Sequence, residues 1–312
     1  MKSTPRTAYI LQIHKNPDQV NMFINQLISE GLADVFIHID KRKYEQLSGK
    51  LVKNKHVKVL EKSIICEWGD ISQVDTTIML LRKVVASNNH YDFVCLRSGQ
   101  DLLVKDGFKE FLLENKNKVF MDFKSVTKKN MCAMEIKWPK KARSRYTSAH
   151  PIRIFRRVLQ DLYSIGINLF PNKNFWPKEY SFYKGSQWFT IPFEVAKYII
   201  DFLDDNEWYY NFFKNTFTPD EWFFHTLIMN SHFKSNVANN NLLFLKWGEK
   251  FSERNSPQCL TMADIHVIEK SDNFFARKFD ENIDKPVIEY YKNHARFGGN
   301  IKPKKKEVMS HA

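Results

Sequence analysis

The feature that most constrains the fold is the alternation of apolar, β-rich runs with amphipathic helical patterns from the N-terminus to about residue 123. The runs with strand character lie at residues 7–13, 35–39, 57–60, 93–96 and 119–123, and the helical patterns lie at 17–31, 71–85 and 108–112. Parallel strands need long crossover connections, which helices commonly provide. The sequence therefore predicts an α/β fold with a mostly parallel central sheet and helices on both faces.

The second half of the chain has a less regular pattern. It predicts a turn that enters a strand at residues 185–189 and helices that begin at Pro192 and Thr218. The sequence contains no repeat of fixed period and no linker-like stretch. We therefore expect one domain over residues 1–300, followed by a basic tail over residues 301–312.

Charge and motif content limit the possible classes of function. The 312 residues include 48 Lys and Arg against 35 Asp and Glu, which gives a formal net charge of +13. Such a charge favours anionic partners, namely nucleic acid, a membrane surface or a phosphorylated substrate. Neither a G-x-G-x-x-G fingerprint nor a G-x-x-x-x-G-K-[ST] loop occurs, which excludes the common dinucleotide-binding motif and the P-loop.

The cysteines and the hydropathy pattern indicate the compartment. Cys66, Cys95, Cys132 and Cys259 are too far apart in sequence for a metal knuckle, and we expect them to be reduced thiols. The N-terminal residues are too polar for a signal peptide, and no run approaches the roughly 18 apolar residues of a membrane span. These patterns predict a cytoplasmic protein.

Polar residues directly follow two of the predicted strands. Asp40 follows the run at 35–39, and the segment Ser98-Gly99-Gln100-Asp101 follows the run at 93–96. Ligands of parallel α/β sheets bind beyond the carboxyl ends of the strands. We therefore expect these residues to lie at a ligand-binding edge.

Seven short motifs occur in an order and spacing that resemble one known family. They are His14-Lys15-Asn16-Pro17, His38-Ile39-Asp40, Trp68-Gly69 with Ser72-Gln73-Val74, Ser98-Gly99-Gln100-Asp101, Gly185-Ser186-Gln187-Trp188, Thr218-Pro219-Asp220-Glu221 and Phe275-Ala276-Arg277-Lys278-Phe279-Asp280. From about residue 7 to 285, the chain is similar to the core-2/I-branching glycosyltransferases, which include β-1,6-N-acetylglucosaminyltransferases and peptide xylosyltransferases. The resemblance implies a GT-A fold, a UDP-sugar donor, inversion at the anomeric carbon, and no divalent metal or other cofactor.

Glu221 is the candidate general base. An inverting transfer needs a carboxylate that accepts the proton of the attacking hydroxyl group, and the resemblance gives this role to the glutamate of the Pro-Asp-Glu motif. The same residues also have a structural interpretation, because Thr218 and Glu221 have the spacing of a capping box with Pro219 at the first helical position. Both interpretations can hold together, because a helix start is a rigid position for a catalytic carboxylate.

Lys278 and Arg277 are the candidates for binding the donor diphosphate. The chain has no Asp-x-Asp motif after the run at 93–96, and a fixed cation can stabilise the departing diphosphate in place of a metal. By resemblance, Lys278 is the counterpart of the family's diphosphate-binding lysine. The alternative is an ordinary surface ion pair of Lys278 with Asp280 or Glu281.

Further donor contacts follow from the resemblance. The family usually has a second basic residue after the proline that corresponds to Pro257, whereas this chain has Gln258, so we expect Arg254 to take over. His14 and Asn16 follow the first strand, where the nucleotide would lie. His14 can equally be a structural histidine.

Two aspartates are candidates for contacts with the nucleotide. Asp40 resembles the acidic residue that receives the uridine or its ribose, and its alternative role is that of a turn-forming aspartate after a strand. Asp101 either binds the donor or braces its own loop, and the sequence leaves both roles open.

Acceptor contacts are expected from a basic and aromatic stretch in the middle of the chain and from the segment before the strand at 189. The resemblance places Glu135, Arg143, Arg145 and Trp188 there. Aromatic rings stack on sugar faces, and charged groups form hydrogen bonds with hydroxyl groups. The alternative is that the basic run at 137–157 is a solvated or membrane-facing surface.

Together these inferences predict an inverting glycosyltransferase that moves a sugar such as N-acetylglucosamine from UDP to a hydroxyl group of a glycan or lipid-linked glycan. The net charge and the tail lysines would bring it into peripheral contact with anionic lipid on the inner face of a membrane. The main alternative is a non-catalytic protein that binds nucleic acid or another anionic polymer, but no nucleic-acid-binding signature occurs. A glycosidase would need two facing carboxylates, which a sequence does not show.

Overall fold

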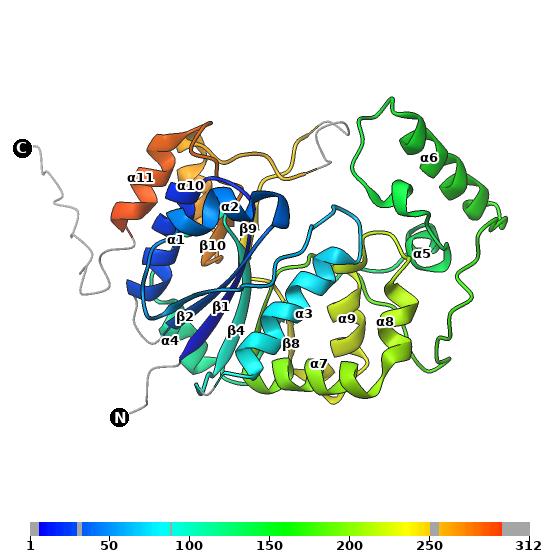
Figure 1. The fold of residues 1–312 in the computed structure, drawn as a ribbon, viewed down its shortest axis with the longest axis horizontal. Helices are drawn as coiled ribbons and strands as arrows, with labels where there is room; N and C mark the ends of the chain where they lie inside the picture. Colours follow the sequence, from blue (N-terminus) through cyan, green and yellow to red (C-terminus); the bar gives the residue numbers. More distant parts are fainter. Residues whose placement is uncertain (1–5, 30–32, 88, 250–255, 295–312) are drawn as a thin grey trace, which may run out of the picture.

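The computed structural model describes residues 6–29, 33–87, 89–249 and 256–294, and its centre is a seven-stranded sheet (Figure 1). The strands are β1 (Thr7–Ile13), β2 (Ala33–Ile39), β3 (Val57–Val59), β4 (Phe93–Ser98), β6 (Val119–Met121), β7 (Phe189–Pro192) and β8 (Val237–Asn239). They lie in the order β3-β2-β1-β4-β7-β6-β8. All five runs with strand character in the first part of the sequence form strands of this sheet.

Most of the strands are parallel. β1 lies between β2 and β4 and is parallel to both, whereas β7 runs opposite to its neighbours β4 and β6. Every residue of β2 and β4 is buried, as expected for continuous apolar runs that are covered on both faces. The predicted α/β class with a mostly parallel sheet is confirmed, and the arrangement is that of a GT-A-like fold.

Helices cover both faces of the sheet (Figure 1). One face is covered by α1 (Pro17–Ser29), with α11 (Lys285–His294) beside it, and the other by α3 (Ser72–Val85) and α7 (Phe193–Asp205). The remaining helices are α2 (Tyr44–Leu47), α4 (Phe108–Glu114), α5 (Lys128–Glu135), α6 (Pro151–Ser164), α8 (Glu207–Phe213), α9 (Phe223–Met229) and α10 (Ile265–Lys270). The helices expected near Pro17 and Pro192 are therefore confirmed.

A second, three-stranded sheet joins the C-terminal part of the chain to the first half. It consists of β5 (Asp101–Leu103), β10 (Phe275–Arg277) and β9 (Leu243–Leu245), with β10 in the middle. β10 is antiparallel to β5, which places Arg277 opposite Asp101. The ring of Phe275 packs edge-on against Tyr9 of β1 and Phe23 of α1, so this sheet is attached to the main core.

The hydrophobic core has a main part and a satellite. The main part surrounds the central sheet. The satellite lies under α5 and α6 and contains Trp138, Leu159 and Tyr163. In Figure 1, α6 projects from the upper right of the molecule.

All four cysteines are free thiols, as the sequence predicts, and Cys95 and Cys132 are buried. No helix in the described part of the chain is both long enough and apolar enough to cross a bilayer. The predicted basic tail, residues 301–312, lies outside the described residues. The single domain over residues 1–300 stays a prediction.

Candidate active site

The carboxyl ends of the parallel strands meet at one edge of the sheet, and most of the predicted donor residues lie there. β1 and β2 end in register, so His14 and Asp40 follow side by side, and the Asp40 amide donates a hydrogen bond to the Ile13 carbonyl oxygen at 2.9 Å. β4 ends at Ser98 on the other side of β1. Because β7 runs in the opposite direction, it begins at this same edge, directly after Trp188.

Arg277 is fixed from two sides. Its Nη1 atom lies 2.7 Å from Oδ1 of the fully buried Asp101 and also donates a hydrogen bond to the Ser98 hydroxyl. Its guanidinium carbon lies 4.6 Å from the centre of the Trp188 ring, which is a cation–π distance. Asp101 also accepts a hydrogen bond from the Ser98 amide at 2.9 Å. Through these contacts, Asp101 stabilises its own loop and fixes the position of the Arg277 guanidinium.

Lys278 is half-buried, and in the described part of the chain it forms no ion pair with a carboxylate. Asp280 is paired instead with Lys15 and accepts a hydrogen bond from Nδ2 of Asn16 at 2.9 Å. The alternative of a surface pair between Lys278 and Asp280 is therefore wrong, and no described ion pair joins Lys278 to Glu281 either. Burial lowers the pKa of Lys278, and neighbouring cations lower it further.

Four cationic side chains gather around this point. Lys278 lies within electrostatic range of Lys15, Arg277 and Arg145. The ion pairs described above neutralise Arg277 and Lys15, whereas Lys278 and the exposed Arg145 keep their charge uncompensated by any described carboxylate. Because like charges that lie close together repel one another, the cluster favours a ligand with several negative charges, such as a diphosphate.

His14 and Asn16 lie beside this cluster. Partial burial lowers the pKa of His14 below its ordinary value, and the charges of Lys15 and Arg277 lower it further, which favours the neutral imidazole. A neutral imidazole can donate one hydrogen bond and accept another. Asn16 has a left-handed backbone (φ 53°), and its amide is used to hold Asp280. The contacts therefore make Asn16 a support of the cluster.

The carboxylate of Asp40 forms its hydrogen bonds with residues of the turn that follows β2 and with Cys66. Its Oδ1 accepts hydrogen bonds from N and Nε of Arg42, both at 2.9 Å, and its Oδ2 accepts from Nη2 of Arg42 at 2.8 Å and from the Cys66 amide at 3.0 Å. Burial opposes ionisation of Asp40, but these hydrogen bonds outweigh it and hold the pKa of the carboxyl below its ordinary value. The contacts support the turn-forming role.

The predicted capping box at Thr218 is wrong. Thr218 has a left-handed backbone (φ 50°), and its side chain makes no capping hydrogen bond. Pro219–Glu221 forms a single 3-10 turn, and α9 begins only at Phe223. The carboxylate of Glu221 is therefore not used by a helix N-terminus, and its side chain is 38% exposed.

Lys184 is a residue of this site that the sequence reasoning missed. Its Nζ atom lies 3.0 Å from Oε2 of Glu221, and the amide of the next residue, Gly185, donates a hydrogen bond to the Glu221 carbonyl oxygen at 2.8 Å. The ion pair orients the carboxylate of Glu221 toward Lys184. Lys184 directly precedes the Gly185–Trp188 motif, and this position is the sequence signal that could have identified it.

Gly185 is the point at which this motif passes through a narrow gap. A Cβ atom there would lie 1.9 Å from the Asp122 carbonyl oxygen and 2.5 Å from Nε2 of His225, so no larger residue fits. Three residues later the motif reaches Trp188, whose ring packs under Arg277. One short segment thus connects the Glu221 turn with the cation cluster.

Asp220 does not act together with Glu221. Burial, and then the charge of Glu221, raise the pKa of Asp220. Its Oδ1 atom is buried and has no hydrogen-bond partner among the described residues. The neighbouring Glu221 is exposed and paired, so the two carboxyls have different environments, and the arrangement is not that of a glycosidase acid–base pair across a sugar bond.

The predicted acceptor residues do not gather at one surface. Arg143 is buried, and its Nη1 atom lies 2.9 Å from Oδ2 of Asp70, so it supports the fold. Glu135 accepts a hydrogen bond from a tyrosine hydroxyl. Trp188 is 6% exposed, which leaves little of its ring for a sugar. Arg145 belongs with the donor-side cations.

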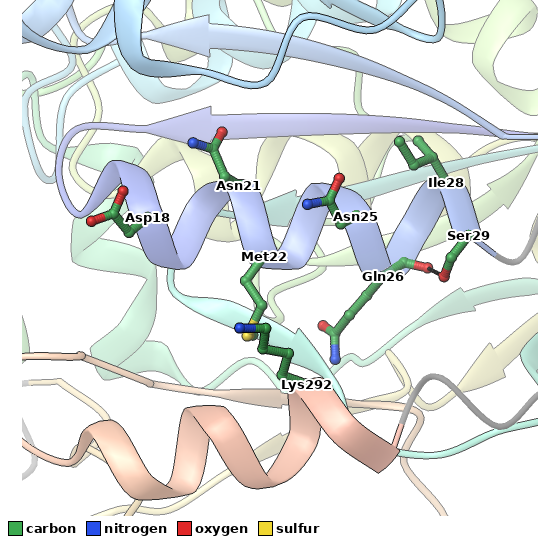
Figure 2. Close-up of a pocket in the computed structure, with 8 residues that line it drawn as sticks. All are labelled: Asp18, Asn21, Met22, Asn25, Gln26, Ile28, Ser29 and Lys292. Atoms are coloured by element: carbon green, nitrogen blue, oxygen red, sulfur yellow. Dashed lines mark hydrogen bonds between the residues drawn. The ribbon is translucent and has the colours of Figure 1, made fainter.

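Other described parts of the chain add no further predicted donor residue. Arg254 lies outside the described residues, and within them no three His, Cys, Asp or Glu side chains are grouped so that they could hold a metal ion. A pocket of about 490 Å³ lies between α1 and α11, where Met22 and Lys292 approach each other (Figure 2). None of the predicted site residues lines this pocket.

Several known proteins are similar to this chain in sequence. Xylosyltransferase oxt of Drosophila melanogaster is 24% identical over 281 residues, which are 81% of this chain and 29% of that protein. Xylosyltransferase of Ciona intestinalis is 23% identical over 320 aligned positions (94% of this chain, 34% of that protein), and xylosyltransferase 1 of Homo sapiens is 22% identical over 310 (92% and 30%). The chain spans about a third of the length of these relatives.

The family assignment rests on a match over most of the chain. The profile of the Core-2/I-Branching enzyme family covers residues 4–273, which include six of the seven motifs and end just before the last one, at residues 275–280. The chain therefore belongs to the Core-2/I-branching enzyme family of glycosyltransferases.

Proposed function

We propose that the protein is an inverting glycosyltransferase that uses a UDP-sugar and transfers the sugar to a hydroxyl group of a glycan or lipid-linked glycan. The observation that carries the proposal is the cation cluster, in which Lys278 remains uncompensated beside Arg277, Lys15 and Arg145. It lies at the carboxyl edge of a parallel sheet, where such folds bind nucleotides. A second observation supports it: the exposed carboxylate of Glu221 is linked to this cluster through the Gly185–Trp188 segment.

In the proposed reaction, Glu221 accepts the proton of the acceptor hydroxyl group while the acceptor oxygen forms a bond to the anomeric carbon of the sugar. The bond from that carbon to the UDP oxygen breaks, and its electron pair leaves with UDP. Lys278 stabilises the negative charge that grows on the diphosphate, and Arg277 assists from a fixed position. Lys184 keeps the carboxylate of Glu221 in place.

The cations could supply the positive charge for which many glycosyltransferases use a metal. We therefore propose that the transfer needs no divalent ion. The proposed donor sugar is N-acetylglucosamine or a related sugar, and xylose is the second candidate because the relatives carry the name xylosyltransferase. We place the protein in the cytoplasm, in peripheral contact with the inner face of a membrane, because of its net charge of +13.

The proposal is tested with the full chain, a panel of UDP-sugars that includes the N-acetylglucosamine and xylose forms, and a panel of glycan acceptors, in EDTA. Nuclear magnetic resonance of the anomeric proton identifies the linkage of each product. We expect transfer in EDTA, with inverted configuration. A product with retained configuration contradicts Glu221 as the base for a single displacement, and transfer that requires added Mn²⁺ contradicts the metal-free mechanism. Release of sugar from a glycan without any nucleotide would contradict the transferase.

A further inference from the structure

Helix α6 has an apolar face that the fold leaves uncovered. Leu159 and Tyr163 point into the satellite core, whereas Ile154, Phe155 and Val158 are 48%, 41% and 48% exposed. These exposed side chains are spaced by one, three and four positions, so they lie on one side of the helix. An uncovered apolar stripe of this kind is typical of helices that dock on another surface.

The chain that follows α6 has further exposed apolar side chains. Ile165, Ile167, Leu169 and Phe170 are 72%, 46%, 56% and 43% exposed, and Phe175 is 65% exposed. Of the 14 large apolar side chains that are exposed among the described residues, eight lie between residues 154 and 175. Scattered exposed apolar residues are normal, but such a concentration in one segment indicates an interaction surface.

The same part of the chain carries most of the net charge. Residues 137–178 contain ten basic residues and one acidic residue, Asp161, which is +9 of the formal +13 of the chain. Lys140, Lys141, Arg157 and Lys173 are all exposed. Apolar side chains flanked by exposed Lys and Arg have the chemistry of a surface that enters the headgroup region of an anionic bilayer.

We propose that α6 and the segment that follows it, to Phe175, form a surface by which the protein docks on a membrane that contains anionic lipid. The apolar side chains enter the boundary between headgroups and acyl chains, and the flanking cations bind the lipid phosphates. This inference rests on the proposed function for its purpose, which is to bring the enzyme to a lipid-linked acceptor, but docking itself is measured independently of catalysis.

The position of α6 relative to the candidate active site supports this purpose. The buried guanidinium of Arg156 on α6 lies 5.0 Å from the ring centre of Phe217 and 5.9 Å from that of Trp68. Phe217 lies two residues before the turn Pro219–Glu221. In Figure 1, α6 stands on the side of the molecule at which the central strands end. Docking through α6 would therefore hold the candidate base near the membrane surface.

Two other occupants explain the surface less well. Nucleic acid would account for the basic residues but not for the exposed Ile154 and Val158. A second copy of the chain would cover the apolar residues, but it would bring two surfaces of high positive charge together, which is unfavourable. Charge complementarity therefore favours anionic lipid.

The test is co-sedimentation of the full chain with phosphatidylcholine vesicles, with and without about 30% phosphatidylglycerol. The docking variant carries Ile154→Gln, Phe155→Gln and Val158→Gln; all three positions are exposed on a helix, so the fold tolerates glutamine. The matched control carries Met262→Gln and Val267→Gln, which are each 44% exposed and lie in or beside α10, at the opposite end of the molecule in Figure 1.

We expect the wild type and the control to bind anionic vesicles, and the docking variant to bind about tenfold more weakly or worse. Neutral vesicles should bind the wild type weakly, and high salt should reduce its binding to anionic vesicles. Binding of UDP by the docking variant should equal that of the wild type. If UDP binding is absent in all proteins while vesicle binding follows the expected pattern, the proposed function fails and the docking surface stands.

The lysines of the C-terminal tail could also account for binding to anionic vesicles, and a further variant tests this explanation. Substitution of Lys302, Lys304, Lys305 and Lys306 by glutamine in the full chain should leave most vesicle binding intact. Loss of binding in this tail variant with full binding by the α6 variant would overturn the proposal. The proposal would also be overturned if the wild type did not bind anionic vesicles. It would equally be overturned by a dimer in solution that only the α6 substitutions dissociate, or by binding to nucleic acid, measured by gel shift, that is stronger than binding to vesicles.

Discussion

The donor-side edge of the central sheet and the α6 end of the molecule are both rich in cations, but the two regions are built differently. At the edge, buried or nearly buried carboxylates hold Arg277 and Lys15 in place. Between residues 137 and 178, a single acidic residue accompanies ten basic ones, and most of those are exposed beside apolar side chains.

The difference separates two uses of positive charge. Arg277 and Lys15, which carboxylates hold in place, have fixed positions beside the uncompensated Lys278, and such an arrangement suits a small ligand of defined shape such as a diphosphate. Exposed cations on a helix can adjust, and they suit an extended surface such as lipid headgroups. The predictions that follow test this distinction between a built site and a surface.

The largest effect is expected for Glu221→Gln, which removes the proposed base from the built site. The rate constant kcat should fall by about a thousandfold, because a positioned general base contributes about 10²–10⁴. The affinity for UDP should stay unchanged, because the amide has the same size. Glu194→Gln, a substitution of another exposed glutamate, is the control, and steady-state kinetics with calorimetry measure both quantities. A variant that keeps more than a tenth of the rate would show that another group takes the proton.

Asp101→Asn should cause the largest loss of stability. It leaves the Arg277 guanidinium beside a buried neutral amide, and breaking such a pair costs about 3 kcal/mol of unfolding free energy. The matched change at the other region, Glu135→Gln, should cost less than about 1 kcal/mol because Glu135 is exposed. Urea denaturation compares the two. Equal losses would contradict the distinction between the regions.

Acid should lower the stability of the protein by protonating Asp280 beside the cation cluster. Despite the opposing effect of burial, the hydrogen bonds from Lys15 and Asn16 lower the pKa of Asp280 to about 2. Its contribution is present above the unfolded pKa, about 4, and is lost as the pH falls through 2, a change on the order of 2 kcal/mol. When the unfolding free energy is measured by denaturation between pH 5 and 2, its decrease toward low pH should be smaller by this amount in Asp280→Asn than in the wild type. An unchanged slope would show that the ion pair does not contribute to stability.

The smallest effect is expected for Lys184→Met, because Lys184 is a positioning residue. Loss of the ion pair should lower kcat about tenfold by freeing the Glu221 carboxylate, and KM for the donor should hardly change. Lys184→Arg should restore part of the rate. If KM for the UDP-sugar rises and kcat stays constant, Lys184 binds the donor instead.

Much of the fold could be predicted from the sequence because its signals are local. The apolar runs of β1, β2 and β4 are continuous and are separated by helical patterns, so both the element types and the parallel arrangement follow. The strand ends then place His14 and Asp40 at one edge. The order of the motifs supplied Glu221 and Lys278 as candidates.

The contacts within the site could not be predicted because they join distant parts of the chain. The pair of Arg277 and Asp101 spans 176 positions and depends on the pairing of β10 with β5. Thr218 has the sequence of a capping residue, but its left-handed backbone directs it elsewhere. Arg143 looks like an acceptor contact in a basic run, yet the fold buries it beside Asp70. Residue type alone does not distinguish such cases.

The central claim is that an uncompensated lysine binds the diphosphate of a UDP-sugar. The most direct measurement is calorimetric titration of UDP into the wild type, Lys278→Ala and Lys58→Ala in EDTA, where Lys58 is another half-buried lysine, on the edge strand β3. The account predicts that UDP binds the wild type and the Lys58 variant equally well, and the Lys278 variant about tenfold to a hundredfold more weakly. Equal binding by all three proteins, or binding by the wild type only after Mn²⁺ is added, would contradict it.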